Sequence, residues 1–295
     1  MAPTGNASER DIDLSVDLGT YRREAVSNVD GGTGEGRTFF DLGLRLMLSY
    51  QHEMASQCFL QSLRHSPDCA LAHSLVALCH CPDYNFKGDA YYESTNHPDE
   101  ADKEDPLCIF PSQQLAARHS QLAVAKVEEI RKLHRDNNKA EKKKKGKRSA
   151  NESKEEATTD SAPVLPDMIT DVESQLVSAI RVLTCNPGVN ADLANELVGR
   201  PYADTMRSIY QKYPNDAEVA YFFVEALMVL NAWQLYEYPT GRPLSDDVVE
   251  TRSILETALQ THRNHAGLCH MYVHLSEMSA DPGKALDYCQ PLRKE

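Results

Sequence analysis

The chain has 295 residues, of which 41% are hydrophobic and 25% charged, so it can bury a core and can form two domains or one elongated array. Its net charge of -13 excludes general nucleic-acid binding over the folded surface, because attraction to phosphates needs a positive face. No apolar run approaches the roughly 18 residues that span a bilayer, and residues 1–20 lack the basic start and apolar centre of a secretory signal. The sequence therefore predicts a cytoplasmic or nuclear protein without a membrane segment.

Residues 1–36 are predicted to be mostly irregular, and helices are predicted to follow. From Phe39 to His65, apolar residues recur at steps of three and four, and Pro67 ends the second run. Two short helices joined at residues 50–53 fit this spacing. Strand patterns are nearly absent, so we expect an all-α fold.

Residues 37–134 are predicted to form N-terminal helical hairpins, interrupted by an acidic, turn-rich loop at 82–110. Residues 135–166 are polar, poor in aromatics and blocky in charge, which predicts a disordered linker. Within it, KAEKKKKGKR at 139–148 carries seven basic side chains and one acidic one, which leaves a net charge of -19 for the rest of the protein. This lysine run is either a solvated linker or a patch for nuclear import or an acidic partner, and it is the one place where we expect contact with nucleic acid.

Residues 167–295 are predicted to contain further helical hairpins and to be open at the C-terminus. In YADTMRSIYQKYPNDAEVAYFFVEALMVLNAW, Pro214 closes one helix and another begins at Asp216. DDVVETRSILETALQTHRNHAGLCHMYVHLSE predicts the next pair. The final stretch DPGKALDYCQPLRKE lacks a polar closing helix, so we expect an exposed apolar edge near Ala285, Leu286 and Cys289, or a partner or lost segment that covers it.

The segment FFDLGLRLMLSYQHEMASQCFLQSLRHSP places Phe39, Gly43, Ala55 and Phe59 at the spacings of a tetratricopeptide repeat, a helical hairpin of about 34 residues. Gly43 and Ala55 are expected to face each other, so that the helices approach to about 8 to 10 Å. Together with DLGTYRREAVS, PYADTMRSIYQKYPNDAEVAYFFVEALMVLNAW and THRNHAGLCHMYVHLSE, this segment resembles a family of tetratricopeptide proteins best known from bacteria. The resemblance implies an α-solenoid of antiparallel hairpins but no known reaction, and the lysine run departs from it.

HMYVHLSE, residues 270–277, places three polar side chains at steps of four and three, so that they share one face of a helix. In a tetratricopeptide array this face lines the concave groove, together with the same side of the preceding first helix. The predicted groove comprises Tyr221, Glu225, Met228, His270, His274 and Glu277.

Three interpretations of this set stay open. The histidines can be bonded to neighbouring carboxylates in a polar wall, they can bind a partner as donors, or His270 and His274 can share a metal ion with Glu225 or Glu277. A zinc-protease helix is excluded, because Met271 stands where the water-activating glutamate is needed.

No nucleophile elbow, phosphate-binding loop or dinucleotide-binding glycine pattern occurs in the sequence, so we do not expect an enzyme or a cofactor. We expect a non-catalytic scaffold that binds a peptide or helix of an unidentified partner in the groove, and the acidic charge favours a basic or neutral segment. The aromatic residues Trp233, Tyr236 and Tyr238 either form a rim for that peptide or cap a core. The alternative is a metal-binding helical-repeat protein, or a metal-dependent enzyme, that uses the two histidines and nearby carboxylates.

Overall fold

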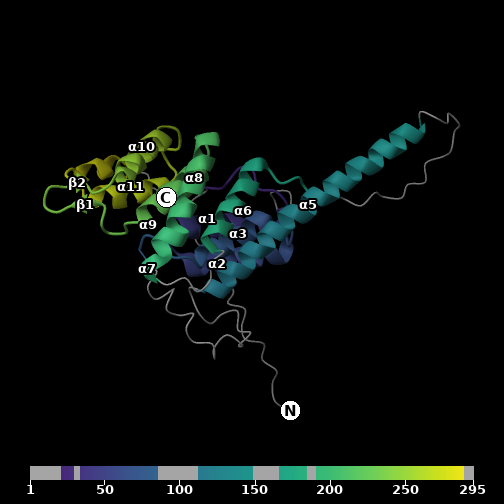
Figure 1. Ribbon diagram of the computed structural model, residues 1–295, viewed down its shortest axis with the longest axis horizontal. Helices are drawn as coiled ribbons and strands as arrows, with labels where there is room; N and C mark the ends of the chain where they lie inside the picture. Colours follow the sequence, from purple (N-terminus) through teal and green to yellow (C-terminus); the bar gives the residue numbers. More distant parts are fainter. Residues whose placement is uncertain (1–20, 30–33, 86–111, 149–165, 185–190, 289–295) are drawn as a thin grey trace, which may run out of the picture.

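The computed structural model describes residues 21–29, 34–85, 112–148, 166–184 and 191–288 (Figure 1). Most of this part of the chain is helical, which confirms the prediction of an all-α fold. The strands within it are β1 (Tyr236–Glu237) and β2 (Arg242–Pro243), which pair antiparallel in one short hairpin. In the described ranges, no helix has both the length and the apolar character needed to cross a bilayer.

The first two helices form the hairpin expected from the apolar spacing. α1 (Glu35–Leu48) is followed after three residues by α2 (His52–His65), and the two helices pack against each other. Phe40 of α1 meets Phe59 of α2 edge to face, with the ring centroids 5.6 Å apart. Both rings belong to the main hydrophobic core, so burial of these apolar faces stabilises the pairing.

Gly43 of α1 lies against the ring of Phe59 on α2, while its expected approach to Ala55 stays a prediction. A Cβ atom at Gly43 would stand 2.9 Å from that ring. Ala55 is also fully buried, so a small residue is present on each helix as expected. The contact that requires glycine is nevertheless with the aromatic ring.

We expect Gly43→Val to lower the free energy of unfolding by about 1–3 kcal/mol, because the added atoms overlap a ring that the core holds in place. Urea denaturation measures this difference. Gly283→Val is the control, since Gly283 is exposed and a Cβ there meets only the Asp281 carboxylate at 3.4 Å. Equal losses in the two variants would contradict the close contact with Phe59.

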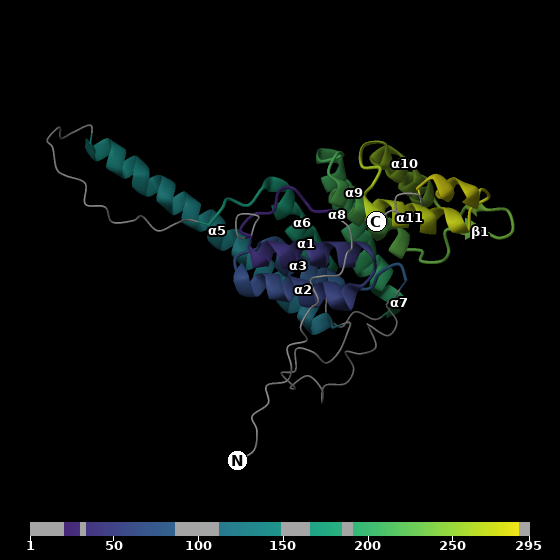
Figure 2. The same ribbon diagram turned by 180° about the vertical axis from the view of Figure 1, so that it is seen from behind.

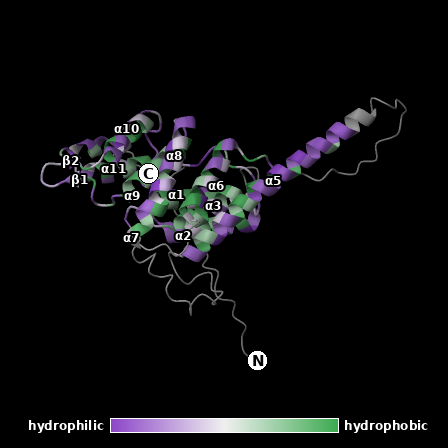
Figure 3. Cartoon of the chain, in the orientation of Figure 1, coloured by the Kyte–Doolittle hydropathy of each residue, from purple (hydrophilic) through white to green (hydrophobic). Residues whose placement is uncertain are grey.

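The long helix α5 (Gln113–Arg148) packs across α3 (Ala70–Cys79), which is buried along its whole length. Ala116, Ala123 and Ile130 repeat at steps of seven on the packed face of α5 and are buried. Arg131 and His134 still bond to the Ser174 hydroxyl and the Pro166 carbonyl, at 2.7 Å each. Toward its C-terminal end the helix then leaves the body and projects as an arm (Figure 1). Figure 3 shows that this arm is hydrophilic.

The structure corrects the disordered linker predicted at 135–166, because residues 135–148 continue α5 as a helix. Lysine, glutamate, arginine and alanine all have high helix propensity. The docked first half of α5 also supplies the nucleus, so that extension of the helix costs little. Residues 149–165 lie outside the described residues, as does the acidic loop from 86 to 110.

The later ranges contain, in chain order, α6 (Asp171–Thr184), α7 (Ala191–Ala194), a π-helical turn (Asn195–Gly199), α8 (Arg200–Lys212), α9 (Ala217–Val229), α10 (Asp246–Thr261), α11 (Ala266–Glu277) and a 3-10 turn (Pro282–Ala285). From α8 onward each α-helix packs on the next, and α6 packs on both α5 and α8. The predicted helix start at Asp216 is confirmed, since its carboxylate accepts a hydrogen bond of 3.1 Å from the Val219 amide.

α11 also contacts α1, although the two helices lie far apart in the sequence. A Cβ atom on Gly267 at the start of α11 would stand 2.7 Å from Leu48, the last residue of α1, and 2.9 Å from Tyr221 of α9. Figure 2 shows α10 and α11 at one end of the body and the arm of α5 at the other. The end of α1 therefore covers the face of α9 and α11 that was predicted to be an open groove wall.

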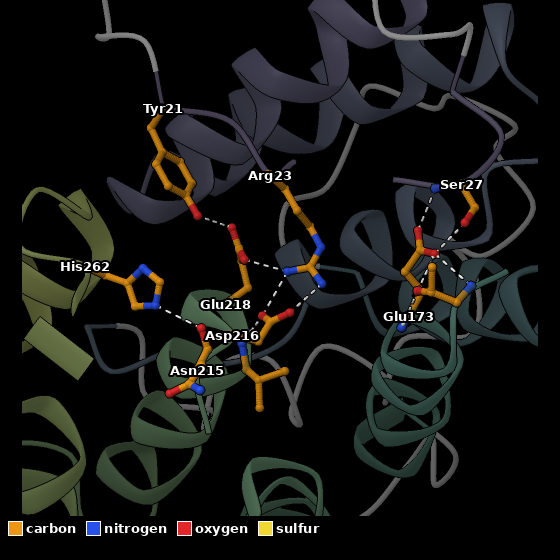
Figure 4. Close-up of polar contacts among 10 residues, drawn as sticks. Tyr21, Arg23, Ser27, Glu173, Asn215, Asp216, Glu218 and His262 are labelled. Atoms are coloured by element: carbon orange, nitrogen blue, oxygen red, sulfur yellow. Dashed lines mark hydrogen bonds and ion pairs between the residues drawn. The ribbon is translucent and has the colours of Figure 1, made fainter. Parts of the chain in front are cut away.

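Residues 21–29, which we call the N-terminal strap, are not helical, as predicted, but are tied to the body by charged groups (Figure 4). The Arg23 guanidinium lies 2.7 Å from the Asp216 carboxylate and 2.5 Å from that of Glu218, at the start of α9. The Tyr21 hydroxyl also donates a hydrogen bond to Glu218. Burial of Arg23 and Glu218 makes this ion pair part of the interior.

Further along, the strap is anchored to the start of α6. The buried Glu173 carboxylate accepts hydrogen bonds from the Ser27 amide at 2.7 Å and from the Ser27 hydroxyl at 2.5 Å. The Asn28 side chain donates to the carbonyl of Asp167 at 3.0 Å. The strap therefore connects α6 with α9.

The C-terminal turn only partly matches the predicted apolar edge. Leu286 is 62% exposed, as expected, whereas Ala285 is buried because the 3-10 turn packs on α11. Cys289 lies outside the described residues.

Candidate functional site

A polar and aromatic cluster lies where the end of α1 meets α9 and α11, with the Tyr50 side chain at its centre. Its members, which we call the Tyr50 cluster, are Tyr50, His52, Asp83, Tyr84, Tyr221, Glu225, Trp233, His270, His274 and Glu277. Five of these residues belong to the groove set predicted from the sequence. The other five come from outside the two helices that were considered.

Tyr50 follows the end of α1 and has a φ of 59°, which lies in the left-handed region that favours glycine. Its amide donates to the Met47 carbonyl at 3.0 Å, and the Gln51 amide donates to the Leu46 carbonyl at 2.9 Å, which caps the helix end. Trp233, beyond the end of α9, has a φ of 63°. Such backbone costs on the order of 1–3 kcal/mol for a bulky residue and is concentrated at functional sites.

Glu225 projects from α9 toward Tyr50, whose hydroxyl donates a hydrogen bond of 3.0 Å to Oε1 of the carboxylate. Burial raises the pKa of Glu225 to about 7, although the charge of His52 and the Tyr50 hydrogen bond both favour the ionised form. Burial and the adjacent carboxylate in turn raise the pKa of Tyr50, so this hydroxyl keeps its proton. Glu225 can therefore exchange a proton near neutral pH.

His52 and Asp83 form an ion pair beside this carboxylate. Nδ1 of His52 lies 3.1 Å from Oδ2 of Asp83, and the imidazole stacks on the Tyr50 ring at a centroid distance of 5.2 Å. Burial alone would lower the pKa of His52, but the Asp83 carboxylate outweighs it and raises the pKa above its ordinary value. The Asp83 carboxylate thus favours the charged form of His52 beside Glu225.

The two α11 histidines have different environments. His270 lies edge-on to Tyr50 at 4.9 Å, and its Nδ1 is 3.5 Å from the Leu48 carbonyl. Burial, followed by the neighbouring His274, lowers the pKa of His270. Nδ1 of His274 instead pairs with the Glu277 carboxylate at 2.9 Å. Only this outer pair matches the predicted polar wall in which histidines bond to carboxylates.

Two aromatic rings extend the cluster toward solvent. The buried Tyr84 ring stacks on Trp233 at 5.3 Å, and both rings contact His274, at 5.0 Å and 5.9 Å. Trp233 is 43% exposed, so the cluster has an outer edge formed by Trp233, His274 and the exposed Glu277. Of the other predicted rim aromatics, Tyr236 is buried against Arg252 and Tyr238 is exposed.

The predicted groove residues are not all on one open wall. Met228 is 1% exposed and belongs to the hydrophobic core, which corrects its assignment to the groove. Tyr221 is also 1% exposed and packs against Gly267. Its hydroxyl has no hydrogen-bond partner within the described ranges. The physical reason is the contact of α1 with α11, which fills the inner face beside α9.

The arrangement gives no support to a metal site. Within the described ranges, no group of three or more His, Cys, Asp and Glu side chains converges closely enough to hold a metal ion. The α11 histidines lie near each other, with centroids 4.7 Å apart, but the nitrogens Nδ1 of the two rings are directed to Leu48 and to Glu277. The predicted alternative ligand set of His270, His274, Glu225 and Glu277 is therefore not assembled.

Sequence reasoning missed Tyr50, His52, Asp83 and Tyr84 because they belong to the α1 to α3 region, and no local pattern predicts that this region meets α9 and α11. One local signal was available for Tyr50. It occupies the position after a helix end that glycine usually takes, and a large aromatic residue there is uncommon.

Comparison of the chain with models of known protein families, with curated proteins and with solved structures finds no match.

Proposed function

We propose that this protein is a non-catalytic interaction scaffold, built as a tetratricopeptide-like array of helical hairpins, which binds a segment of a partner protein. The packing of each helix from α8 onward on the next supports the array. Because α1 covers the inner face of α9 and α11, we place the binding surface at the outer edge of the Tyr50 cluster. That surface consists of Trp233, His274 and Glu277.

The single observation that carries this proposal is the exposed and strained Trp233. Its backbone is held in the left-handed region, and its ring is supported from behind by Tyr84 and His274. Tryptophan is enriched among the residues that dominate binding energy in protein interfaces, because a large rigid ring gains much contact for little entropy. A partly exposed ring with rigid support is suited to this role.

The negative charge at this outer edge favours a partner segment that is basic or neutral. Glu277 is exposed beside Trp233 and His274, and the protein without its lysine run carries a net charge of -19. Complementary charge speeds association and disfavours wrong partners. We therefore propose a basic or neutral segment as the ligand.

Site-specific photocrosslinking tests this function. We expect p-benzoylphenylalanine in place of Trp233 to capture a reproducible partner peptide that is basic or neutral, whereas the same group in place of Leu122, which is exposed on α5, does not capture it. Adding Glu277→Lys to the first variant should reduce the yield, because it places a positive charge against a basic ligand. Capture of the same proteins at both positions, or a yield that Glu277→Lys does not change, would contradict the proposal.

A further inference from the structure

Glu225 is an exception on a buried helix. From Ala217 to Met228, every other residue of α9 is buried, whereas Glu225 keeps partial exposure to solvent. A carboxylate in such surroundings is costly unless a partner compensates it. Within the described residues, the hydrogen bond to Glu225 comes from the neutral Tyr50 hydroxyl, and it occupies only Oε1.

The charges near Glu225 leave an uncompensated negative charge. Within the described part of the chain, the charged groups that act on Glu225 are His52 and Asp83, and no lysine or arginine is among them. His52 is already paired with Asp83 at 3.1 Å. When Glu225 and Asp83 are ionised, only His52 among the three groups can carry a positive charge, so at least one negative charge is left for a monovalent cation to neutralise.

The neutral groups around Glu225 suit an organic cation. Tyr221 stands four residues before Glu225 on α9, so the two side chains share one face of the helix. The Tyr221 hydroxyl is buried and has no hydrogen-bond partner among the described residues. Its oxygen can accept from an N–H donor. The Tyr50 side chain contacts the carboxylate through its hydroxyl, and its aromatic ring lies edge to face with that of His270. An aromatic face attracts a cation.

We propose that the Glu225 site binds an ammonium group, with the carboxylate as its counter-ion and the Tyr221 hydroxyl as an additional acceptor. An ammonium has three N–H donors and a compact charge, which match one carboxylate, one hydroxyl oxygen and adjacent aromatic rings. A metal ion does not fit as well, because no three ligating side chains converge in the described ranges. The ammonium can belong to a small alkylamine or to a lysine side chain, and this site does not depend on the binding surface proposed at Trp233.

Calorimetric titration of the full-length protein with n-butylammonium chloride tests the proposal, with n-butanol as the neutral probe of similar shape. We expect binding of the ammonium but not of the alcohol. Glu225→Gln should weaken it by about tenfold or more, because a charged hydrogen-bond partner is lost. The matched control Glu128→Gln removes an exposed carboxylate of α5, outside both proposed sites, and should change the affinity less than about twofold. Equal binding of both probes, or unchanged binding by Glu225→Gln, would overturn the assignment.

A pH series gives a second measurement in the unmodified protein and does not rely on the folding of a variant. The titratable groups that face Glu225 from the surrounding elements are Tyr50, His52, Cys79, Asp83, Tyr202 and Tyr221. Since burial raises the pKa of Glu225 to about 7, a proton and the ammonium compete for it. We expect the affinity to rise about tenfold from pH 6 to pH 8, with proton release that depends on buffer ionisation enthalpy. An affinity that does not change with pH would contradict the competition.

Two peptides distinguish the sources of the ammonium. One carries a single lysine between glycines, and the other carries norleucine at the same position, both with blocked ends. If the lysine peptide binds with the same dependence on Glu225 as n-butylammonium, the site accepts a lysine side chain. If only n-butylammonium binds, the site takes a free amine. Failure of both to bind at millimolar concentration would sink the proposal, whereas loss of photocrosslinking at Trp233 would not affect it.

Discussion

Arg23→Met is expected to lower the free energy of unfolding by about 3–5 kcal/mol, because it leaves two carboxylates at the start of α9 without their cation. Arg23 lies only 2.7 Å from Asp216 and 2.5 Å from Glu218, and both Arg23 and Glu218 are buried. Methionine keeps most of the aliphatic volume, so the loss reports mainly on charge. Urea denaturation at pH 7 measures it.

The pH dependence of this loss distinguishes the contribution of the Arg23 charge from the contribution of its packing. Burial alone would raise the pKa of Asp216, but its hydrogen bond and attraction to Arg23 lower it below the ordinary value. The stability that this group contributes is therefore present above its unfolded pKa of about 4 and is lost as pH falls through the folded value. In Arg23→Met the carboxylates gain protons more readily in the folded state, so the difference from the unmodified protein should shrink as pH falls from 7 toward 4.

Arg200→Met is the matched control for the strap. Arg200 lies 2.7 Å from the Asp247 carboxylate, at the same distance that joins Arg23 to Asp216, but its side chain is 43% exposed. An exposed ion pair is worth only about 0–1 kcal/mol, so we expect a loss in that range. A loss at Arg23 no larger than the loss at Arg200 would show that burial adds nothing to the ion pair of the strap.

The helices could be predicted because their information is local. Apolar residues at steps of three and four define α1 and α2, and the cap at Asp216 defines the start of α9. The arm of α5 was missed for the opposite reason. Its composition resembles that of a disordered segment, and only the docking of its first half on α3 supplies the nucleus from which the helix extends.

The Tyr50 cluster shows where local information ends. The spacing on α11 correctly places His270 and His274 near each other, and Glu225 of α9 lies in the same cluster. What the spacing does not contain is the contact of α1 with α11, which brings Tyr50 and His52 to the same place. That contact also turns Tyr221 and Met228 from expected groove residues into buried ones. Residues more than 150 positions apart meet there, and no periodicity within one helix reports such a meeting.

The second large effect is expected at the interface between α3 and α5. Nδ1 of His73 lies 3.0 Å from Nδ1 of His119, and both side chains are buried. One ring must donate and the other accept, so the accepting imidazole has to be neutral and the contact cannot persist when both rings are protonated. Burial lowers the pKa of each to about 4, with Lys126 acting against a charge on His73, and His73, Arg118 and His80 acting against one on His119. At His73, the nearby Asp68 carboxylate acts in the opposite direction and raises the pKa, but burial outweighs it.

The sign of the pH effect follows from these values. Each folded-state pKa is below the ordinary value of about 6.5, so the stability that the neutral pair contributes is present above pH 6.5 and is lost as pH falls toward 4. At about 1.4 kcal/mol per pKa unit, the two groups together account for a loss of roughly 3–5 kcal/mol between pH 7.5 and pH 4.5. This loss should loosen the docking of α5, because both rings lie in its contact with α3.

His73→Leu combined with His119→Leu is expected to remove that part of the acid sensitivity. Two apolar side chains replace the neutral pair without a charge to bury, so stability at pH 7.5 should change little while the fall toward pH 4.5 becomes smaller by roughly 3–5 kcal/mol. Urea denaturation at the two pH values gives the difference, and amide hydrogen exchange in α3 and α5 locates it. His65→Leu, at an exposed position on α2, should keep the pH dependence of the unmodified protein. If the double variant loses as much stability between pH 7.5 and pH 4.5 as the unmodified protein does, the buried histidine pair is not the source of the acid sensitivity.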